Sequence, residues 1–198
     1  MKKIIKIKLT LLLFLMPMVI NNKMFSNQLP NAYIAHRDIV VETLEIEMNK
    51  ILKGNYFKFS RIDIDHLYFM ELNRIKYNIP KHIFYRLIYQ ESRYKKNAKS
   101  PAGAIGYMQV MPATFKWINS RTSLLLTDIT NPYDNIRAGS YLLRYLKDRI
   151  DNDYLKISES YKWKLVLASY NAGYSRKFTA LKKYKETMNY VAFICKST

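Results

Sequence analysis

Apolar residues recur at helical spacing along most of the chain, and one such stripe ends in an acid. Ile83, Phe84, Leu87 and Ile88 share one helical face by i, i+3, i+4 spacing, and Glu91 continues that face. Desolvation and the negative end of the helix dipole both disfavour an ionised carboxyl there. Both effects raise its pKa toward the range of a general acid, so Glu91 is a candidate proton donor. A solvated carboxylate at the helix edge is the alternative that spacing alone leaves open.

Other stripes predict further helices on both sides of this one. Asp63 and Asn131-Pro132 are typical helix starts, and Gly173 is a typical helix end after residues 163–170. The predicted stripes are Val40, Leu44, Met48 and Ile51; Ile64, Leu67, Tyr68, Glu71 and Ile75; Ile136, Gly139, Leu143 and Leu146; and Phe178, Leu181 and Tyr184. Together they predict an all-α, mainly helical fold with at most a small hairpin near residues 100–110. Gly139 is expected to be a point of close packing between helices.

A glycine-containing loop follows the helix that carries Glu91 and runs from Ser100 to Pro112. Gly103 and Gly106 allow tight turns and a close approach of the backbone. Beside them the loop places three consecutive side chains, Tyr107, Met108 and Gln109. A loop of this kind beside a desolvated acid predicts the wall of a cleft for a polar, ringed ligand. Filling of the core is the alternative for the tyrosine and the methionine.

The first residues have the pattern of an export signal. A lysine-rich start precedes an apolar run from Leu9 to Ile20, which is too short for a membrane span of about 20 residues. We therefore expect a signal peptide over residues 1–25 and a location in the periplasm or cell envelope, with membrane contact only through an uncleaved signal. Residues 26–75 are predicted to be a helical segment packed on a catalytic domain at 76–198. A separate binding module is the alternative for that segment.

The net charge of +18 indicates an anionic partner, because so basic a chain attracts polyanions. The charge is spread along the chain without a nucleic-acid-binding motif, so no nucleic acid is expected. The single cysteine, Cys195, excludes an intramolecular disulfide. The three histidines have no ligand spacing, so neither a metal nor another cofactor is predicted. They are His36, His66 and His82.

Four sequence blocks resemble the successive motifs of the soluble lytic transglycosylase (SLT) family. They are Glu91-Ser92, Gly103-Ala-Ile-Gly-Tyr-Met-Gln-Val-Met-Pro112, Ala168-Ser-Tyr-Asn-Ala-Gly173 and Glu186-Thr-Met-Asn-Tyr-Val191. Their order and spacing match the family from about Tyr77 to Val191. The resemblance implies a goose-lysozyme-like fold and cleavage of bacterial peptidoglycan.

For the chemistry, the resemblance implies one residue, Glu91, that is first the acid and then the base. It protonates the oxygen between N-acetylmuramic acid (MurNAc) and N-acetylglucosamine (GlcNAc), while the acetamido group of the MurNAc covers C1. The 6-hydroxyl of that sugar then attacks C1 and forms a 1,6-anhydro ring. A hydrolase of the goose-lysozyme type, with a second carboxylate, and a non-catalytic wall-binding protein are the alternatives. Asp128 and Asp134 are interpreted as helix caps, not as that second carboxylate.

The resemblance also assigns roles to residues around the acid. Ser92 and Ser100 match serines that bind near the acid and the sugars, and Met108-Gln109 match a pair on the cleft floor. Tyr170 matches a tyrosine that stabilises the charged intermediate. The remaining expected substrate contacts are Tyr107, Asn171, Glu186 and Tyr190. The sequence departs from the family pattern at Ser169 and Met188.

Peptidoglycan strands are therefore the expected partner. The small size and the lack of wall-anchoring repeats weakly favour a role beside a secretion machine, with a cell-division machine as the alternative.

Overall fold

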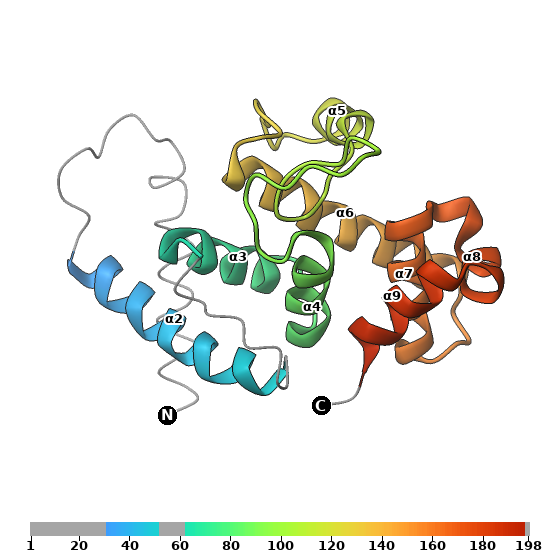
Figure 1. The fold of residues 1–198 in the computed structure, drawn as a ribbon, viewed down its shortest axis with the longest axis horizontal. Helices are drawn as coiled ribbons and strands as arrows, with labels where there is room; N and C mark the ends of the chain where they lie inside the picture. The colour runs from blue at the N-terminus through green and yellow to red at the C-terminus, as the bar shows by residue number, and fades with distance from the viewer. Residues whose placement is uncertain (1–30, 52–61, 197–198) are drawn as a thin grey trace. The chain divides into compact units, whose positions relative to one another are not determined.

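The computed structural model describes residues 31–51 and 62–196 (Figure 1). The chain divides into two compact units, residues 1–39 and 40–198. Of the first unit, the structure describes only the beginning of helix α2 (Asn31–Ile51). The predicted signal peptide lies outside the described residues. In the part of the chain that is described, all regular elements are helical, which confirms the all-α prediction.

Helix α2 begins earlier than its apolar stripe predicted, at Asn31. Within the second unit its buried residues are Val41 and Leu44, so the buried face is turned slightly from the predicted one, which placed Val40 inward. Glu47 on the same helix forms an ion pair with Lys81. Contacts along one side of its C-terminal half thus fix this part of α2 within the second unit.

Two helices then lead to Glu91, namely α3 (Ile64–Lys76) and α4 (Lys81–Ser92). The prediction that Asp63 caps α3 is confirmed, because its carboxylate accepts the backbone N–H of Asp65 at 2.9 Å and of His66 at 3.4 Å. Such a cap satisfies amides that the first helical turn leaves without a partner. Helix α4 is buried from Ile83 to Ile88 and ends at Ser92, after which Arg93 adopts a left-handed conformation with φ 52°.

The longest described helix, α6 (Pro132–Asp153), starts at its predicted cap. The Asn131 side chain accepts the backbone N–H of Tyr133 at 2.9 Å. The predicted stripe is buried, as the exposed fractions of 0–5% for Ile136, Leu143 and Leu146 show. Gly139 is a close-packing point as expected, but its neighbour is Met108 in a loop and not another helix. A Cβ added at Gly139 would lie 2.5 Å from the Met108 sulfur.

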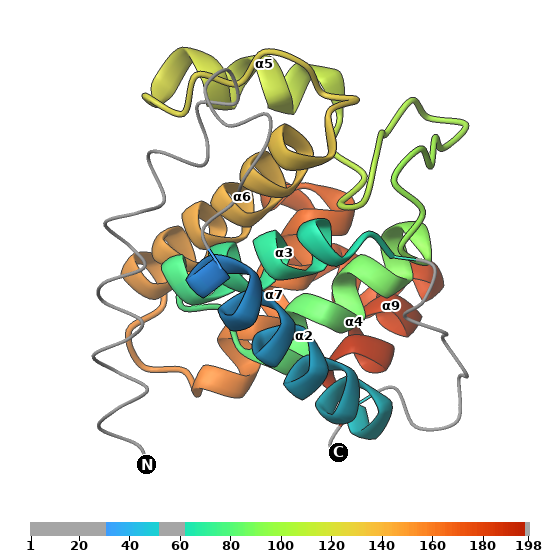
Figure 2. The same ribbon diagram turned by 90° about the vertical axis from the view of Figure 1, so that its left-hand side faces the viewer.

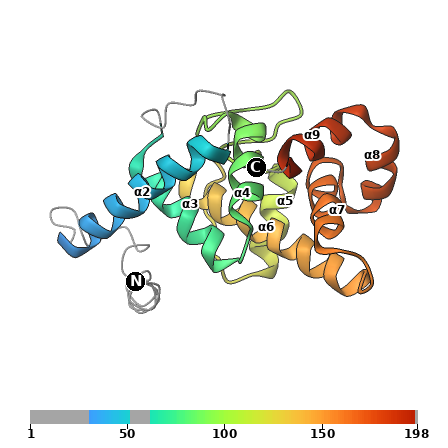
Figure 3. The same cartoon turned by 90° about the horizontal axis from the view of Figure 1, so that it is seen from below.

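The remaining helices are α5 (Pro112–Arg121), α7 (Glu159–Ala172), the short 3-10 helix η2 (Tyr174–Arg176), α8 (Lys177–Lys183) and α9 (Lys185–Cys195). Helix α6 packs against α3 and α7, and α9 packs against α4, α7 and α8 (Figures 2 and 3). The predicted stripe of Phe178, Leu181 and Tyr184 is wrong. Phe178 and Tyr184 are exposed, and Ala180 is buried instead, because this seven-residue helix turns its small residue inward.

Arg86 fastens the last helix to α4. Its buried guanidinium donates to the carbonyl oxygen of Ile194 at 3.3 Å and also to that of Lys196. These carbonyls lie at the end of α9, where helical hydrogen bonding leaves acceptors without a partner. Helices α4 and α9 are thereby joined at the C-terminal end of α9. In the described ranges, none of the helices is both long and apolar enough to cross a bilayer.

Candidate active site

The candidate acid, Glu91, lies in the last turn of α4. Its side chain keeps a little exposed surface, but the carboxyl group is largely desolvated, and burial raises its pKa to about 7. The Tyr190 hydroxyl on α9 donates to Oε1 of Glu91 at 2.5 Å. This hydrogen bond favours the ionised form and therefore opposes part of the rise. At neutral pH the group is divided between its acid and base forms.

Two tyrosines, Tyr170 and Tyr190, interact electrostatically with this carboxyl. Tyr170, near the end of α7, donates to the backbone carbonyl of Met108 at 2.7 Å. Burial, and after it the charge of Glu91, raise the pKa of Tyr170 well above 10. The same two causes raise the pKa of Tyr190. Both phenols therefore stay protonated across the physiological range and act only as donors or neutral acceptors.

The arrangement suits proton transfer from one carboxyl oxygen. Because Oε1 of Glu91 already accepts from Tyr190, Oε2 is the oxygen left to carry the acidic proton. A carboxyl with a pKa near 7 can donate a proton at neutral pH and can take one back, which is what a group acting first as acid and then as base needs. Three helices and one loop contribute to this site: α4, α7, α9 and the loop before α5.

The loop at residues 98–110 is held by its own backbone. The N–H of Gly106 bonds to the carbonyl of Ala98 at 2.8 Å, and the Ser100 hydroxyl oxygen accepts the N–H of Ala104 at 3.0 Å. In place of a regular hairpin there are two isolated bridges, at Lys99–Ile105 and Ile105–Val110. Ser100, expected to contact sugar, therefore also closes a tight turn of the loop.

Asn135 on α6 fixes this loop, and sequence reasoning missed it. Its side chain is buried, donates to the carbonyl of Ile105 at 2.8 Å and accepts the N–H of Met108 at 3.0 Å. Gly106 is required beside it, since its φ is +80° and an added Cβ would lie 2.5 Å from the Asn135 amide. The signal that could have identified Asn135 is its position as a polar residue directly before Ile136, which belongs to a predicted apolar stripe.

The side chains of Met108 and Tyr107 lie in the core, and for both residues a substrate contact stays a prediction. Their exposed fractions are 0% and 2%, so neither side chain offers a surface to a ligand. The Tyr107 hydroxyl lies 3.1 Å from Nδ1 of His66, which anchors the loop to α3. Of Met108, the backbone carbonyl is the part that reaches the site, through Tyr170.

A comparison with family models matches residues 70–193 to the transglycosylase SLT domain. The chain belongs to this family. The matched range includes the acid, the loop and both tyrosines described above.

Curated relatives and solved structures agree with this SLT assignment. The membrane-bound lytic murein transglycosylase F of Vibrio parahaemolyticus is 38% identical over 94 residues, which are 48% of this chain and 16% of the relative. The protein of the same name from Shewanella oneidensis is 36% identical over 100 residues, or 50% of this chain and 19% of the relative. This chain thus spans less than a fifth of the length of these relatives.

Two crystal structures share the fold. An inactive mutant of the lytic transglycosylase Slt from Pseudomonas aeruginosa aligns with a TM-score of 0.55 and 22% identity, covering 71% of this chain and 24% of that one. The 70 kDa soluble lytic transglycosylase of Escherichia coli aligns with a TM-score of 0.55 and 24% identity, covering 69% of this chain and 24% of that one.

Two further predicted site residues of the SLT domain, Ser92 and Gln109, form hydrogen bonds with nearby backbone carbonyls. Ser92 is buried and donates to the carbonyl of Ile88 at 3.1 Å, so only its oxygen is left for a ligand. The Gln109 amide donates to the carbonyl of Gly106 at 2.9 Å and to that of Ala98 at 3.1 Å, within its own loop. For both residues a substrate contact stays a prediction.

Asn171 and Glu186 lie on exposed surface of the SLT domain. Oδ1 of Asn171 accepts the Thr187 hydroxyl at 2.6 Å, which joins the end of α7 to the first turn of α9. Glu186 lies in that same first turn. Their contact with a ligand stays a prediction as well.

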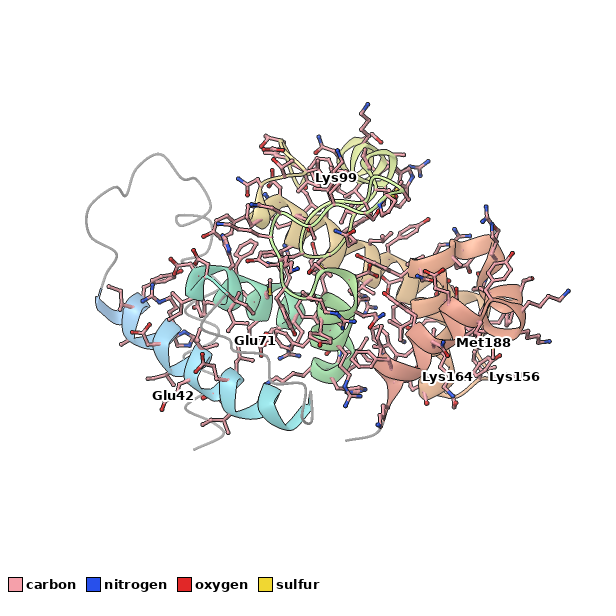
Figure 4. All side chains as sticks on the ribbon, viewed as in Figure 1. Glu42, Glu71, Lys99, Lys156, Lys164 and Met188 are labelled. Atoms are coloured by element: carbon pink, nitrogen blue, oxygen red, sulfur yellow. The ribbon has the colours of Figure 1, made fainter. Side chains whose placement is uncertain are left out.

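Glu71 on α3 is a buried carboxylate that the sequence did not indicate as a site residue (Figure 4). Its two oxygens accept from Arg74, each at 2.7 Å, and Oε2 also accepts the Tyr85 hydroxyl at 2.8 Å. Tyr85 precedes Glu91 by six helical positions, about 9 Å along α4. Glu71 is thus fully engaged in holding α3 to α4, and a nucleophilic carboxylate would need to lie about 5 Å from the acid.

Asp128 and Asp134 are not helix caps, since Asn131 takes that position. Asp134 accepts the backbone N–H of Thr127 at 2.8 Å, and Asp128 accepts that of Thr130 at 2.8 Å. Both order the segment before α6. That segment and α5 line an open pocket of about 520 Å³, and Pro112 is the one residue of its lining that belongs to a block resembling the family motifs. Within the described residues, no group of three or more His, Cys, Asp or Glu side chains is arranged to hold a metal ion.

Proposed function

We propose that this SLT domain is a lytic transglycosylase that cleaves the MurNAc–GlcNAc bond of peptidoglycan and leaves 1,6-anhydro-MurNAc ends. The observation that supports this most is the Glu91 carboxyl, with its pKa of about 7 and its hydrogen bond to Tyr190. It is the group of this chain best suited to donate a proton to a glycosidic oxygen and to take one back.

In the first step Glu91 gives its proton to the bridging oxygen, and the bond from that oxygen to C1 breaks. The acetamido oxygen of the same MurNAc covers the positive charge that develops at C1. In the second step the Glu91 carboxylate takes the proton of the 6-hydroxyl, and O6 bonds to C1. The GlcNAc leaves with the first proton, the acetamido group is released, and no water is consumed.

The surroundings of Glu91 suit this single-residue scheme. The buried carboxylate on α3, Glu71, is paired with Arg74, accepts the Tyr85 hydroxyl and is not available as a nucleophile. Tyr190 holds one carboxyl oxygen and leaves the other for the substrate. Tyr170, whose hydroxyl is a neutral dipole beside the carboxyl, stabilises the charge that develops during the reaction.

The same proposal covers the organisation of the chain. Residues 76–198 form the catalytic domain, residues 26–75 form a helical segment packed on it, and residues 1–25 direct export to the cell envelope. Glycan strands are the partner, and a secretion or cell-division machine is the proposed setting. N-terminal sequencing of the exported protein tests the signal, since a chain that begins at Met1 would contradict its removal.

Mass spectrometry of digested peptidoglycan tests the reaction. Anhydro ends are lighter by one water than reducing ends, so products with reducing ends alone would assign the domain to the hydrolases. The Glu91→Gln variant should lose about two to four orders of magnitude in rate. Glu45→Gln, which changes an exposed carboxylate on α2, is the matched control and should keep wild-type activity. A Glu91→Gln variant that clears peptidoglycan at the wild-type rate would contradict the role of Glu91, and a wild-type protein that releases nothing would support the non-catalytic alternative.

A further inference from the structure

A row of aromatic rings follows one face of α6 and is not used by the chemistry above. The Tyr141 and Tyr145 rings lie 6.4 Å apart between centroids and are nearly parallel, at 22°. The row extends to Tyr77 at the end of α3, 6.4 Å from Tyr141, and to Trp117 of α5, 4.8 Å from Tyr145. Each of these rings is partly exposed. We call these four residues the α6 aromatic row.

This row lies on the side of α6 that faces away from Glu91. Gly139 packs against Met108, whose carbonyl binds Tyr170 in the candidate active site. With 100° per residue, Tyr141 and Tyr145 lie about 200–240° around the helix from Gly139. A ligand on the row therefore does not compete with one at the acid.

Cations accompany the rings. The guanidinium of Arg121 lies 5.7 Å from the centroid of Trp117, that of Arg149 lies 5.9 Å from Tyr145, and the ammonium of Lys76 lies 5.3 Å from Tyr77. Arg149 also stacks on Tyr174 at 3.8 Å, which extends the surface toward η2.

These three cations keep their charge available. Lys76, Arg121 and Arg149 are exposed, and none of them forms an ion pair with a carboxylate of the described residues. The three carboxylates nearest in sequence to Arg149 have other partners. Asp148 binds Arg144, Asp151 binds Lys147 and Lys162, and Asp153 accepts the Tyr174 hydroxyl. The surface thus combines rings with three cations that form no ion pair with a carboxylate of the described residues.

We propose that the α6 aromatic row, with Lys76, Arg121 and Arg149, is a second binding surface for a peptidoglycan strand. The C–H faces of successive sugars pack on the rings, as apolar faces do on aromatic side chains. The carboxylates of the stem peptides pair with the cations. The proposal rests on the proposed function, because only a domain that acts on this polymer gains from holding it at two places.

The row suits a linear polymer better than a compact partner. Along α6 the surface runs from Tyr141 to Arg149, about 12 Å, and Tyr77 and Trp117 add rings from α3 and α5. A strand held here raises the effective concentration of the same wall material at Glu91. Aromatic rings with cations also bind single-stranded nucleic acid, and an anionic membrane attracts cations, so both serve as competing ligands in the test.

The binding test uses the Glu91→Gln protein, which holds the wall without digesting it, and pelleting with purified sacculi. Tyr141→Ala with Tyr145→Ala removes the two central rings and should weaken binding about tenfold. Arg121→Gln with Arg149→Gln leaves the rings and core intact and should weaken it about threefold, with less dependence on salt. Tyr161→Ala with Lys164→Gln, two exposed residues of α7, is the matched control and should bind like the parent. Circular dichroism melting establishes that each variant is folded.

The activity test uses the same changes with Glu91 intact. Turnover of sacculi should fall as binding does, while turnover of short soluble glycan fragments should stay within about twofold, because such fragments fill only the Glu91 site. Unchanged pelleting of the arginine variant and of the tyrosine variant would overturn the surface. So would retention of single-stranded DNA or anionic vesicles as strong as that of sacculi. If the wild type makes no anhydro ends while the row variants still lose sacculi, the proposed reaction fails and the binding surface stands.

Discussion

The stability of the Glu91→Gln variant minus that of the wild type should be larger at alkaline pH than at acidic pH. Glutamine keeps the size of the side chain and an oxygen that accepts from Tyr190, but it cannot ionise. In the wild type the carboxyl must either hold its proton or be charged where water is largely excluded. The glutamine of the variant does not ionise, so the difference in free energy of unfolding between the two proteins reports the cost of charging Glu91.

The magnitude follows from the raised pKa. In the unfolded chain the carboxyl ionises near its ordinary value of 4.5, and in the folded protein near 7. Because the folded pKa is the higher one, the folded state binds the proton more tightly, and stability is lost as the pH rises from about 4.5 to about 7. A separation of this size corresponds to roughly 3 kcal/mol, of which about 2.5 kcal/mol is lost between pH 5 and pH 8.5.

Urea unfolding of both proteins at pH 5 and pH 8.5, followed by tryptophan fluorescence, measures this difference. Other titrating groups are common to the two proteins and cancel. The stability of Glu91→Gln minus that of wild type should grow by about 2.5 kcal/mol from the lower to the higher pH. In thermal melts this is a relative gain of roughly 5–10 °C for a chain of this size.

Glu45→Gln on α2 serves as the control, because an exposed carboxylate keeps its hydration in the folded state. Its stability difference from wild type should not change with pH by more than about 0.5 kcal/mol. A Glu91→Gln difference equally flat with pH would show that the carboxyl is not desolvated, and the argument for a general acid would fail with it. A difference that shrinks toward pH 8.5 would mean that the charged form is stabilised in the fold.

Further predictions concern the neighbours of the acid. Tyr190→Phe removes the hydrogen bond that lowers the pKa of Glu91, so the alkaline limb of the pH–rate profile should move to higher pH; a limb that stays in place or moves down would contradict this. Gly106→Ala adds a clash to backbone strain and should lower the free energy of unfolding by about 3 kcal/mol or more, whereas Gly103→Ala, with open space around it, should cost about 1 kcal/mol by strain alone; equal losses in urea titration would exclude the clash. Glu71→Gln breaks a buried ion pair and should cost about 3 kcal/mol in the same titration while leaving the pH–rate profile in place, and a shifted profile would place Glu71 in the chemistry.

Local sequence rules predicted most of the helices and the raised pKa of Glu91. Asp63 and Asn131 cap their helices because a short polar side chain before an apolar stripe satisfies free amides. The α6 stripe is buried because its period matches the helix over several turns. Glu91 combines an apolar stripe with a helix end, and these two local facts already indicate a raised pKa.

What sequence missed depends on contacts between distant segments. Asn135 fixes a loop some 30 positions earlier, and nothing local to it names that partner. Glu71 is read as part of an apolar stripe, but only the packed structure brings Tyr85 to its carboxylate. Tyr107 is buried because His66 lies opposite, which no motif records. Short α8 gives too few turns for a stripe to be determined from sequence.

The hydrogen bond between Tyr190 and Glu91 joins residues 99 positions apart, and Arg86 reaches the carbonyl of Lys196 across 110 positions. A chain is synthesised from its N-terminus, so Glu91 is in place long before α9 exists. Until then its side of α4 faces water, where a carboxyl near its ordinary pKa is ionised at neutral pH and has no proton to give. The unfinished chain therefore holds the glutamate but not its proton, and the proposed ability to cleave a wall polymer is complete only with the last helix.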